Sequence, residues 1–467
     1  MAKPPKARTL GDLVKSGYEV LTVKQELRKN LIGKIRRREE LFPGIVGYEE
    51  TVIPQLENAV LSGHDLIFLG ERGQAKSRLI RAMTNLLDEY IPIIEGSEVN
   101  DNPFAPVSKF GHDQVEKLGN KTPISWLQRE LRFAEKLATP DITMADLIGE
   151  IDPIKVAEGR YLSDELTIHY GLIPRTNRGI FCINELPDLA ERIQVGLFNL
   201  MEERDIQIKG YRIRLPLDVY VVASANPEDY TNRGRIITPL KDRYGSLVRT
   251  HYPKQIAQEM AIVEQEATPL DDTGVVVSVP DYMKEIIGEI TALARRSPDI
   301  NQRSGVSVRV SICNYENMNS NAIRRAIRAK EKTAAPRVTD LQYLLASTHG
   351  KIELESVEEG RETRLLEELI KKAVLNTFGR HFNVQDLEPL IARFDQGLSI
   401  EVSETMSSKG YVKAMGNLPE IHAALERLQA KEDPPVIASA MEFVLEGLHL
   451  NRRLNRDKVE GAYRYRG

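Results

Sequence analysis

Short apolar runs alternate with amphipathic stretches between residues 41 and 252. The runs at 64–69, 179–183 and 219–224 have the length and composition of strands that are buried on both faces of a sheet. Apolar residues at helical spacing follow the first run and predict a helix over 78–90. Such alternation is typical of a parallel sheet with helices on both faces, so we expect an α/β fold for this part of the chain.

The pattern differs on either side of this region. The first 40 residues are charged and predict helices, and the basic run at 34–38 is typical of a solvated helix face, with a nucleic-acid contact as the alternative. Beyond residue 252, strand signals become rare and helical spacing dominates. The predicted parts are an N-terminal helical segment at 1–40, an α/β domain at 41–252, a helical domain at 253–345 and a mainly helical C-terminal region at 346–467.

Composition narrows the class of protein. The 467 residues include 64 basic and 68 acidic ones, and the net charge of −4 gives no electrostatic case for non-specific binding to DNA or membranes. The two cysteines, Cys182 and Cys313, are too few for a disulfide framework, and no zinc-binding spacing occurs. Because there is no apolar leader and no run of ~18 apolar residues, we expect a cytoplasmic protein without a membrane span.

A glycine-rich segment joins the first predicted strand to the predicted helix. Its residues are Gly70, Glu71, Arg72, Gly73, Gln74, Ala75, Lys76 and Ser77. They fit the pattern GxxxxGK[ST], except that alanine replaces the second glycine. Backbone N–H groups of such a loop bind phosphate oxygens, the lysine reaches the β- and γ-phosphates, and the serine hydroxyl binds Mg²⁺. The segment therefore predicts binding of ATP with Mg²⁺, and the strand before it and the helix after it argue against a chance match.

Polar residues end the next two predicted strands. Asn184 and Glu185 follow one strand, and Asn226 follows the other. Glu185 can activate the attacking water, while Asn184 can contact the water shell of Mg²⁺. An amide carries no charge to neutralise the metal, so Asn184 predicts slower hydrolysis or weaker Mg²⁺ binding. We expect Asn226 to hold the attacking water. Helix capping by the Asn-Glu pair and a simple Asn-Pro turn are the alternatives.

The segment 231–245 is rich in arginine, whose planar fork binds phosphate in a bidentate manner. An arginine presented across a subunit boundary can stabilise charge on the phosphate that is transferred. Arg243 is the first candidate, and Arg235 and Arg233 follow it. A surface salt bridge is the alternative for each of the three.

The order of these motifs resembles that of an AAA+ ATPase. Within this group, the segments 42–47 and 171–186 resemble the magnesium-chelatase I-subunit, and MoxR-type ATPases are similar. The resemblance covers about residues 42–330 and implies a P-loop domain followed by a helical lid. It makes 70–77 the Walker A motif and 184–185 the Walker B motif, with asparagine in place of the usual aspartate.

The same resemblance implies further roles. It places sensor 1 at Asn226, the arginine finger at Arg243 and the sensor 2 arginine at Arg309, for which a solvated helix charge is the alternative. The stretches 146–170 and 201–216 resemble two hairpins that line the centre of such rings. The implied assembly is a homo-oligomeric ring, a hexamer in this family, that acts on a protein client. MoxR-like proteins work through a partner that carries a metal-dependent adhesion domain.

We therefore expect a ring-forming ATPase that remodels a protein partner or assists metal insertion into it. A nucleotide-gated scaffold with little hydrolysis is the first alternative, because of Asn184. A nucleic-acid motor is the second, because Lys209, Arg212 and Arg214 could contact phosphates, although the net charge of −4 argues against it. No motif points to a tetrapyrrole, so an unidentified client is favoured over a role in chlorophyll synthesis.

Overall fold

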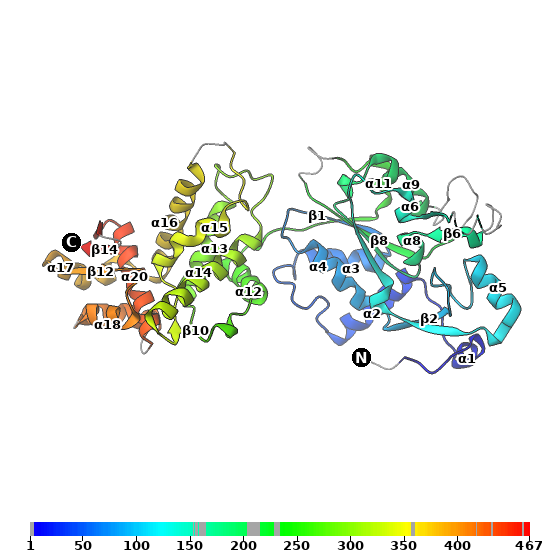
Figure 1. Cartoon of the computed structure of the whole chain (residues 1–467), viewed down its shortest axis with the longest axis horizontal. Coiled ribbons are helices and arrows are strands. Elements are labelled where there is room, and N and C mark those ends of the chain that lie inside the picture. Colours follow the sequence, from blue (N-terminus) through cyan, green and yellow to red (C-terminus); the bar gives the residue numbers. More distant parts are fainter. Residues whose placement is uncertain are drawn as a thin grey trace. The chain divides into compact units, whose positions relative to one another are not determined.

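The computed structural model describes residues 4–152, 154, 157, 165–202, 215–227, 234–355, 360–416, 418–430, 433–459 and 462–467. They form two compact units, Met1–His251 and Tyr252–Gly467, and each is described by itself (Figure 1). Every helix among these residues is too short or too polar to cross a membrane.

A five-stranded sheet forms the centre of the first unit. Its strands follow the order β4 (Phe133–Leu137), β7 (Gly179–Asn184), β8 (Val219–Ala225), β1 (Leu66–Leu69) and β9 (Ser246–Arg249). Every neighbouring pair is parallel, so all five carboxyl ends lie at one edge of the sheet. The candidate residues that end β1, β7 and β8 therefore meet at this edge.

Alternate residues of these strands contribute to two apolar cores, one on each face of the sheet. Phe68 belongs to one core and its neighbour Ile67 to the other, and neither is exposed. The helices on the first face are α2 (Val23–Arg37), α3 (Val52–Ser62) and α4 (Lys76–Ala82), and those on the second are α6 (Met144–Leu147), α8 (Leu172–Arg175), α9 (Glu191–Glu202) and α11 (Thr238–Arg243). Burial on both faces explains why the central strands are continuous apolar runs, and the predicted α/β fold is confirmed.

The helix predicted over 78–90 is wrong at its C-terminal end. Helix α4 is followed by a 3-10 turn, η1 (Met83–Leu86), and Leu87 is extended. The strand β2 (Tyr90–Ile94) comes next and pairs with β3 (Ile124–Gln128) in an antiparallel ribbon. The leucines of this stretch are buried in the same core as α4, so their spacing reflected burial rather than a continuous helix.

The N-terminal segment is tied to the sheet through a buried ion pair. Glu26 of α2 pairs with Arg132 at 2.5 and 2.7 Å, and both side chains are almost fully buried. Arg132 also donates to the carbonyl oxygen of Arg178 at 2.8 Å. Further elements of this unit include α1 (Leu10–Ser16), α5 (Lys109–Leu118) and the antiparallel pair β5 (Gly149–Ile151) and β6 (Ile168–Tyr170).

Helices make up most of the second unit, as predicted for this part of the chain. They are α12 (Ile256–Glu266), α13 (Asp281–Ala294), α14 (Val308–Ala329), α15 (Leu344–Thr348), α16 (Arg361–His381), α17 (Glu388–Asp395), α18 (Ser408–Met415), α19 (Pro419–Arg427) and α20 (Pro434–Leu450). One apolar core extends from Tyr282 of α13 to Tyr465 near the C-terminus.

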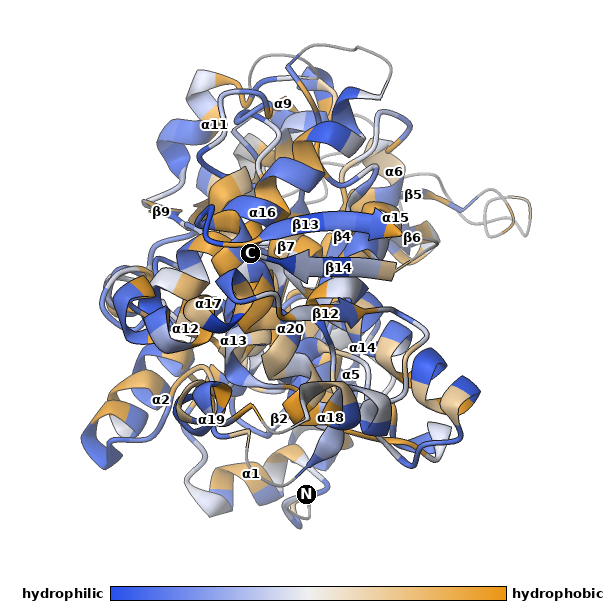
Figure 2. Ribbon diagram, turned by 90° about the vertical axis from the view of Figure 1, so that its left-hand side faces the viewer, coloured by the Kyte–Doolittle hydropathy of each residue, from blue (hydrophilic) through white to orange (hydrophobic). Residues whose placement is uncertain are grey.

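Two small sheets in the second unit were not predicted. One is the parallel pair β10 (Val276–Val277) and β11 (Thr333–Ala334). The other is antiparallel, in the order β12 (Ser399–Val402), β14 (Ala462–Arg466), β13 (Asn455–Val459). Strand β13 is mostly hydrophilic (Figure 2), which is why the apolar pattern of the sequence did not indicate it.

Candidate nucleotide-binding site

The predicted phosphate loop lies between β1 and α4, at the carboxyl edge of the sheet. Gly70 has no room for a side chain, because a Cβ atom there would come within 1.9 Å of Thr250 Oγ1 and 2.2 Å of Gln74 Oε1. Gly73 and Ala75 have positive φ angles of 73° and 55°. Ala75 thus adopts the left-handed conformation that glycine adopts readily, at a cost of about 1 kcal/mol.

The Lys76 ammonium group is surrounded by oxygen atoms. It donates hydrogen bonds to the carbonyl oxygens of Gly70 and Glu71, the latter at 2.8 Å, and to Asn226 Oδ1 at 2.6 Å. Only 7% of Lys76 is exposed. The loop therefore holds a buried positive charge, as phosphate binding requires.

Asn226 connects this lysine to the predicted catalytic acid. Its Oδ1 accepts from Lys76, and its Nδ2 donates to Glu185 Oε2 at 2.5 Å. Glu185 has a φ angle of 54°, a left-handed conformation in which the chain leaves β7. Lys76 of α4 and the residues that directly follow β8 and β7 thus form one hydrogen-bonded chain across the carboxyl edge of the sheet.

Asn184 lies beside a carboxylate that the sequence did not indicate. Its Nδ2 donates to Glu135 of the neighbouring strand β4, and its Oδ1 accepts from Ser224 Oγ at 3.1 Å. Glu135 also pairs with Arg81 of α4 through hydrogen bonds of 2.8 and 3.0 Å. No strand was predicted at 133–137, and the contact depends on the sheet order, which places β4 next to β7.

Groups outside the motif fix the back of the phosphate loop. The Tyr48 hydroxyl lies 2.8 Å from the carbonyl oxygens of both Gln74 and His251, and Thr250 Oγ1 donates to Gln74 Oε1 at 2.7 Å. Burial raises the pKa of Tyr48 to about 12, so its hydroxyl remains protonated and can donate at neutral pH. These contacts anchor the loop to the residues that follow β9.

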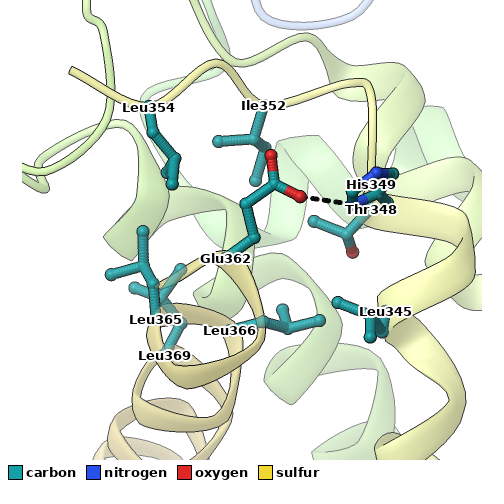
Figure 3. A pocket seen from close by; sticks show the side chains of 9 residues that line it. All are labelled: Leu345, Thr348, His349, Ile352, Leu354, Glu362, Leu365, Leu366 and Leu369. Atoms are coloured by element: carbon teal, nitrogen blue, oxygen red, sulfur yellow. Dashed lines mark ion pairs between the residues drawn. The ribbon is translucent and has the colours of Figure 1, made fainter. Parts of the chain in front are cut away.

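A cleft of about 400 Å³ opens beside the loop, which is a usual volume for a small-molecule site. Its lining includes Gly70, Glu71, Gln74, Pro227, Lys241 and Arg249. A cavity of the second unit, between α15 and α16, is different in kind. It encloses only about 20 Å³ between leucine and isoleucine side chains, with the ion pair of His349 and Glu362 beside them (Figure 3). That volume holds about one water molecule, so the second cavity is no nucleotide site.

Two of the arginine candidates form ion pairs with α9. Arg243, at the end of α11, binds Glu202 with an Nε–Oε2 distance of 2.9 Å and donates to the carbonyl oxygen of Pro239 at 2.8 Å. Arg235 lies 3.4 Å from Glu191, and both of these side chains are well exposed. The salt bridges named as the alternative are therefore present in the single chain.

The remaining predicted basic residues lie in the second unit or outside the described residues. Arg309 is an exposed residue in the first turn of α14, in the second unit. Arg233 falls outside the described residues, as does most of the hairpin predicted at 201–216, with Lys209, Arg212 and Arg214. Of the hairpin predicted at 146–170, the described part includes the strand pair β5 and β6.

The side-chain oxygens at this edge suit Mg²⁺. Ser77 begins α4 together with Lys76. Asn184 ends β7 and Glu185 follows it, while Glu135 lies in the middle of the neighbouring strand β4. No cluster of three or more His, Cys, Asp or Glu side chains arranged for a metal ion occurs among the described residues. Mg²⁺ usually takes one or two protein oxygens together with substrate phosphates and waters, so such a site needs no all-protein cluster.

These features define the class of protein. A parallel sheet with helices on both faces, a phosphate loop after β1 and polar residues at the ends of β7 and β8 make up a P-loop domain of the AAA+ kind. No family model matches the chain.

Comparison with curated proteins identifies more specific relatives. The chain is 26% identical over 375 residues to the magnesium-chelatase subunit ChlI of a Nostoc species, covering 74% of this chain and 91% of the relative. It is 26% identical over 348 residues to ChlI of Anabaena variabilis, covering 69% and 93%. A solved complex of the BchI and BchD subunits of magnesium chelatase aligns with 71% of this chain and 98% of that chain, at 19% identity and a TM-score of 0.36. The sequence similarity to ChlI confirms the predicted resemblance to the magnesium-chelatase I-subunit and MoxR-like group.

Proposed function

We propose that this chain is a ring-forming ATPase that couples ATP hydrolysis to the remodelling of a protein partner or to metal insertion into it. The observation that carries the proposal is the hydrogen-bonded chain of Lys76, Asn226 and Glu185. It brings a phosphate-binding cation, an amide and a candidate base together at the edge where ligands bind in open α/β sheets.

Each residue has a distinct role in this proposal. Lys76 and the N–H groups of its loop bind the β- and γ-phosphates, whose oxygens replace Asn226 and the loop carbonyls around the ammonium group. Asn226 and Glu185 orient the attacking water, and Glu185 accepts its proton. Mg²⁺, when bound, neutralises phosphate charge, and Ser77 and Asn184 are the residues proposed to contact it or its water shell.

Arg243 is proposed to complete the site of the next subunit in the ring. Its side chain is 28% exposed and its partner Glu202 is 56% exposed, so their ion pair contributes about 0–1 kcal/mol and a phosphate can compete for the guanidinium. Arg309 is proposed to contact nucleotide from the helical lid. The curated relatives are named as subunits of magnesium chelatase, which supports an assembly with protein partners. A partner with a metal-dependent adhesion domain is one candidate.

Mg²⁺-dependent ATP turnover by the purified chain tests the proposal. We expect turnover that is lost in Lys76→Ala and Glu185→Gln and retained in Lys117→Ala, a matched control at an exposed lysine of α5. ATP binding should survive in Glu185→Gln, because this residue does not hold phosphate. Turnover that persists in Lys76→Ala would contradict the assignment of the phosphate loop.

A nucleotide-gated scaffold is the second candidate, favoured by the uncharged amide of Asn184. It predicts tight ATP binding with negligible turnover, and a rise in turnover in Asn184→Asp. The ring itself is tested by light scattering with and without ATP. Arg243→Ala should leave ATP binding intact and lower turnover only in the assembled state, whereas an equal loss in the monomer would exclude a role across a subunit boundary.

A further inference from the structure

We propose that Glu135 supplies the negative charge toward Mg²⁺ that Asn184 lacks, and that Arg81 opposes it. The inference rests on the proposed binding of nucleotide at Lys76. It makes Glu135 a positioning residue for the metal's water shell, supplied by the strand next to β7.

The amide of Asn184 already has hydrogen-bond partners within the protein. Its Oδ1 accepts from Ser224 Oγ at 3.1 Å and from Cys182 Sγ at 3.4 Å, and its Nδ2 donates to Glu135. Asn184 is 9% exposed. Both ends of the amide therefore have partners, and the group adds no charge to the site.

The sheet register places Glu135 on the same face as Asn184. Glu135 is paired with Cys182, and Leu137 with Asn184, in the parallel ladder of β4 and β7. Paired residues, and residues two apart on one strand, point to the same face of a sheet. Cys182 lies in the apolar core beneath α4, so Glu135 and Asn184 also lie on the α4 side. This is the side on which Ser77 begins its helix.

Glu135 has acceptor capacity left for a metal-bound water. An ionised carboxylate offers about four lone-pair positions. Oε1 accepts from Asn184 and from Arg81 Nη2, and Oε2 accepts from Arg81 Nε. Oε2 therefore has one donor, Arg81 Nε, and the side chain of Glu135 is 21% exposed.

The ion pair between Arg81 and this carboxylate contributes little to stability. The side chain of Arg81 is 64% exposed, and ion pairs of such arginines contribute about 0–1 kcal/mol. Arg81 lies four residues after Ser77 on α4, so the two side chains share one face of the helix. The guanidinium therefore places a positive charge beside the proposed metal position, where it weakens Mg²⁺ binding.

The two sides of this ion pair thus have opposite effects on Mg²⁺. Removing the carboxylate with Glu135→Gln weakens the coupling between Mg²⁺ and nucleotide, whereas removing the cation with Arg81→Gln strengthens it. If the ion pair had a purely structural role, both variants would change the coupling between Mg²⁺ and nucleotide in the same direction, because either substitution breaks the same contact.

Isothermal titration with a non-hydrolysable ATP analogue measures this coupling. The ratio is the dissociation constant in EDTA divided by the dissociation constant in excess Mg²⁺. We expect the ratio to fall about tenfold in Glu135→Gln and to rise severalfold in Arg81→Gln. The double variant Glu135→Gln/Asn184→Asp exchanges carboxylate and amide across the same hydrogen bond and should restore the ratio. Glu130→Gln removes a carboxylate that is paired at 3.1 Å with Arg129 in the 3-10 turn before β4, and should leave the ratio unchanged.

The outcomes separate this inference from the proposed function. Opposite shifts in the two single variants, with rescue by the exchange, support it. Equal shifts, no shift or failure of the exchange overturns it while the nucleotide site stands. A wild-type chain that does not bind the analogue in either condition overturns both proposals. Thermal melting of each variant identifies any that fails to fold, and the exchange variant then carries the test.

Discussion

Replacing Asn226 with alanine is expected to tighten ATP binding and slow turnover at the same time. Asn226 Oδ1 lies 2.6 Å from the Lys76 ammonium group, and both residues are 7% exposed. A phosphate group must compete with this oxygen for the lysine. The same asparagine donates to Glu185 at 2.5 Å, so its loss also frees the proposed base.

The magnitude follows from the hydrogen bond that is lost. Hydrogen bonds to charged groups contribute about 1.5–3 kcal/mol, and this one must be broken when a phosphate oxygen takes the place of Asn226 at Lys76. Each 1.4 kcal/mol is about tenfold in affinity. Because Lys76 keeps the carbonyl oxygens of Gly70 and Glu71, we expect the lower end, an affinity about tenfold tighter. The nucleotide-free variant should lose a similar free energy of unfolding.

Titration of the variant with the ATP analogue measures the affinity, and single-turnover hydrolysis measures the chemical step. Turnover should fall at least about tenfold, because Glu185 loses the amide that orients it. The double variant Lys76→Ala/Asn226→Ala is the control, because the gain in affinity requires the lysine. An affinity that is unchanged or weaker in Asn226→Ala would refute the reasoning, and a weaker affinity would indicate that Asn226 binds phosphate rather than restraining Lys76.

Three further predictions concern the support of the site. Glu26→Gln leaves Arg132 buried without its carboxylate and should lower the free energy of unfolding by about 3–5 kcal/mol in urea titrations; an unchanged midpoint would contradict this. Gly70→Ala forces a Cβ atom to within 1.9 Å of Thr250 Oγ1 and should abolish binding of the ATP analogue while circular dichroism shows the fold retained. The pKa of Tyr48 is raised to about 12 in the folded chain, so as the pH rises Tyr48 ionises in the unfolded chain before it does in the folded one. The free energy of unfolding should therefore fall between about pH 10 and 12, by at most about 2.7 kcal/mol. Tyr48→Phe should lack this part of the alkaline loss, and equal slopes for the two proteins would count against it.

The sequence predicted best where chemistry and local pattern coincide. The phosphate loop, Asn184–Glu185 and Asn226 all follow apolar runs that form the central strands β1, β7 and β8. Since those strands are parallel, the polar residues at their ends meet at one edge of the sheet. The identity of the strands followed from burial on both faces, which is a property of short sequence windows.

The contacts that the sequence did not predict depend on the order of strands. Glu135 is one charged residue in a short edge strand, and it reaches Asn184 only because β4 lies beside β7. Strand β14 has alternating tyrosine and arginine, and Tyr465 is buried at 3% exposure, but the charged residues around it obscured the pattern. In both cases the partner strand, rather than local apolar spacing, decides what the side chain contacts.

The site consists of two hydrogen-bonded chains that both begin on α4. One is Lys76–Asn226–Glu185, and the other is Arg81–Glu135–Asn184–Ser224. They are joined where the backbone N–H of Glu185 donates to Ser224 Oγ at 3.2 Å. Lys76 and Arg81, which begin the two chains, belong to the same helix. Residues within one such network do not contribute independently. Because Glu135 belongs to the same network as Asn184, an uncharged residue at position 184 is compatible with metal-dependent chemistry.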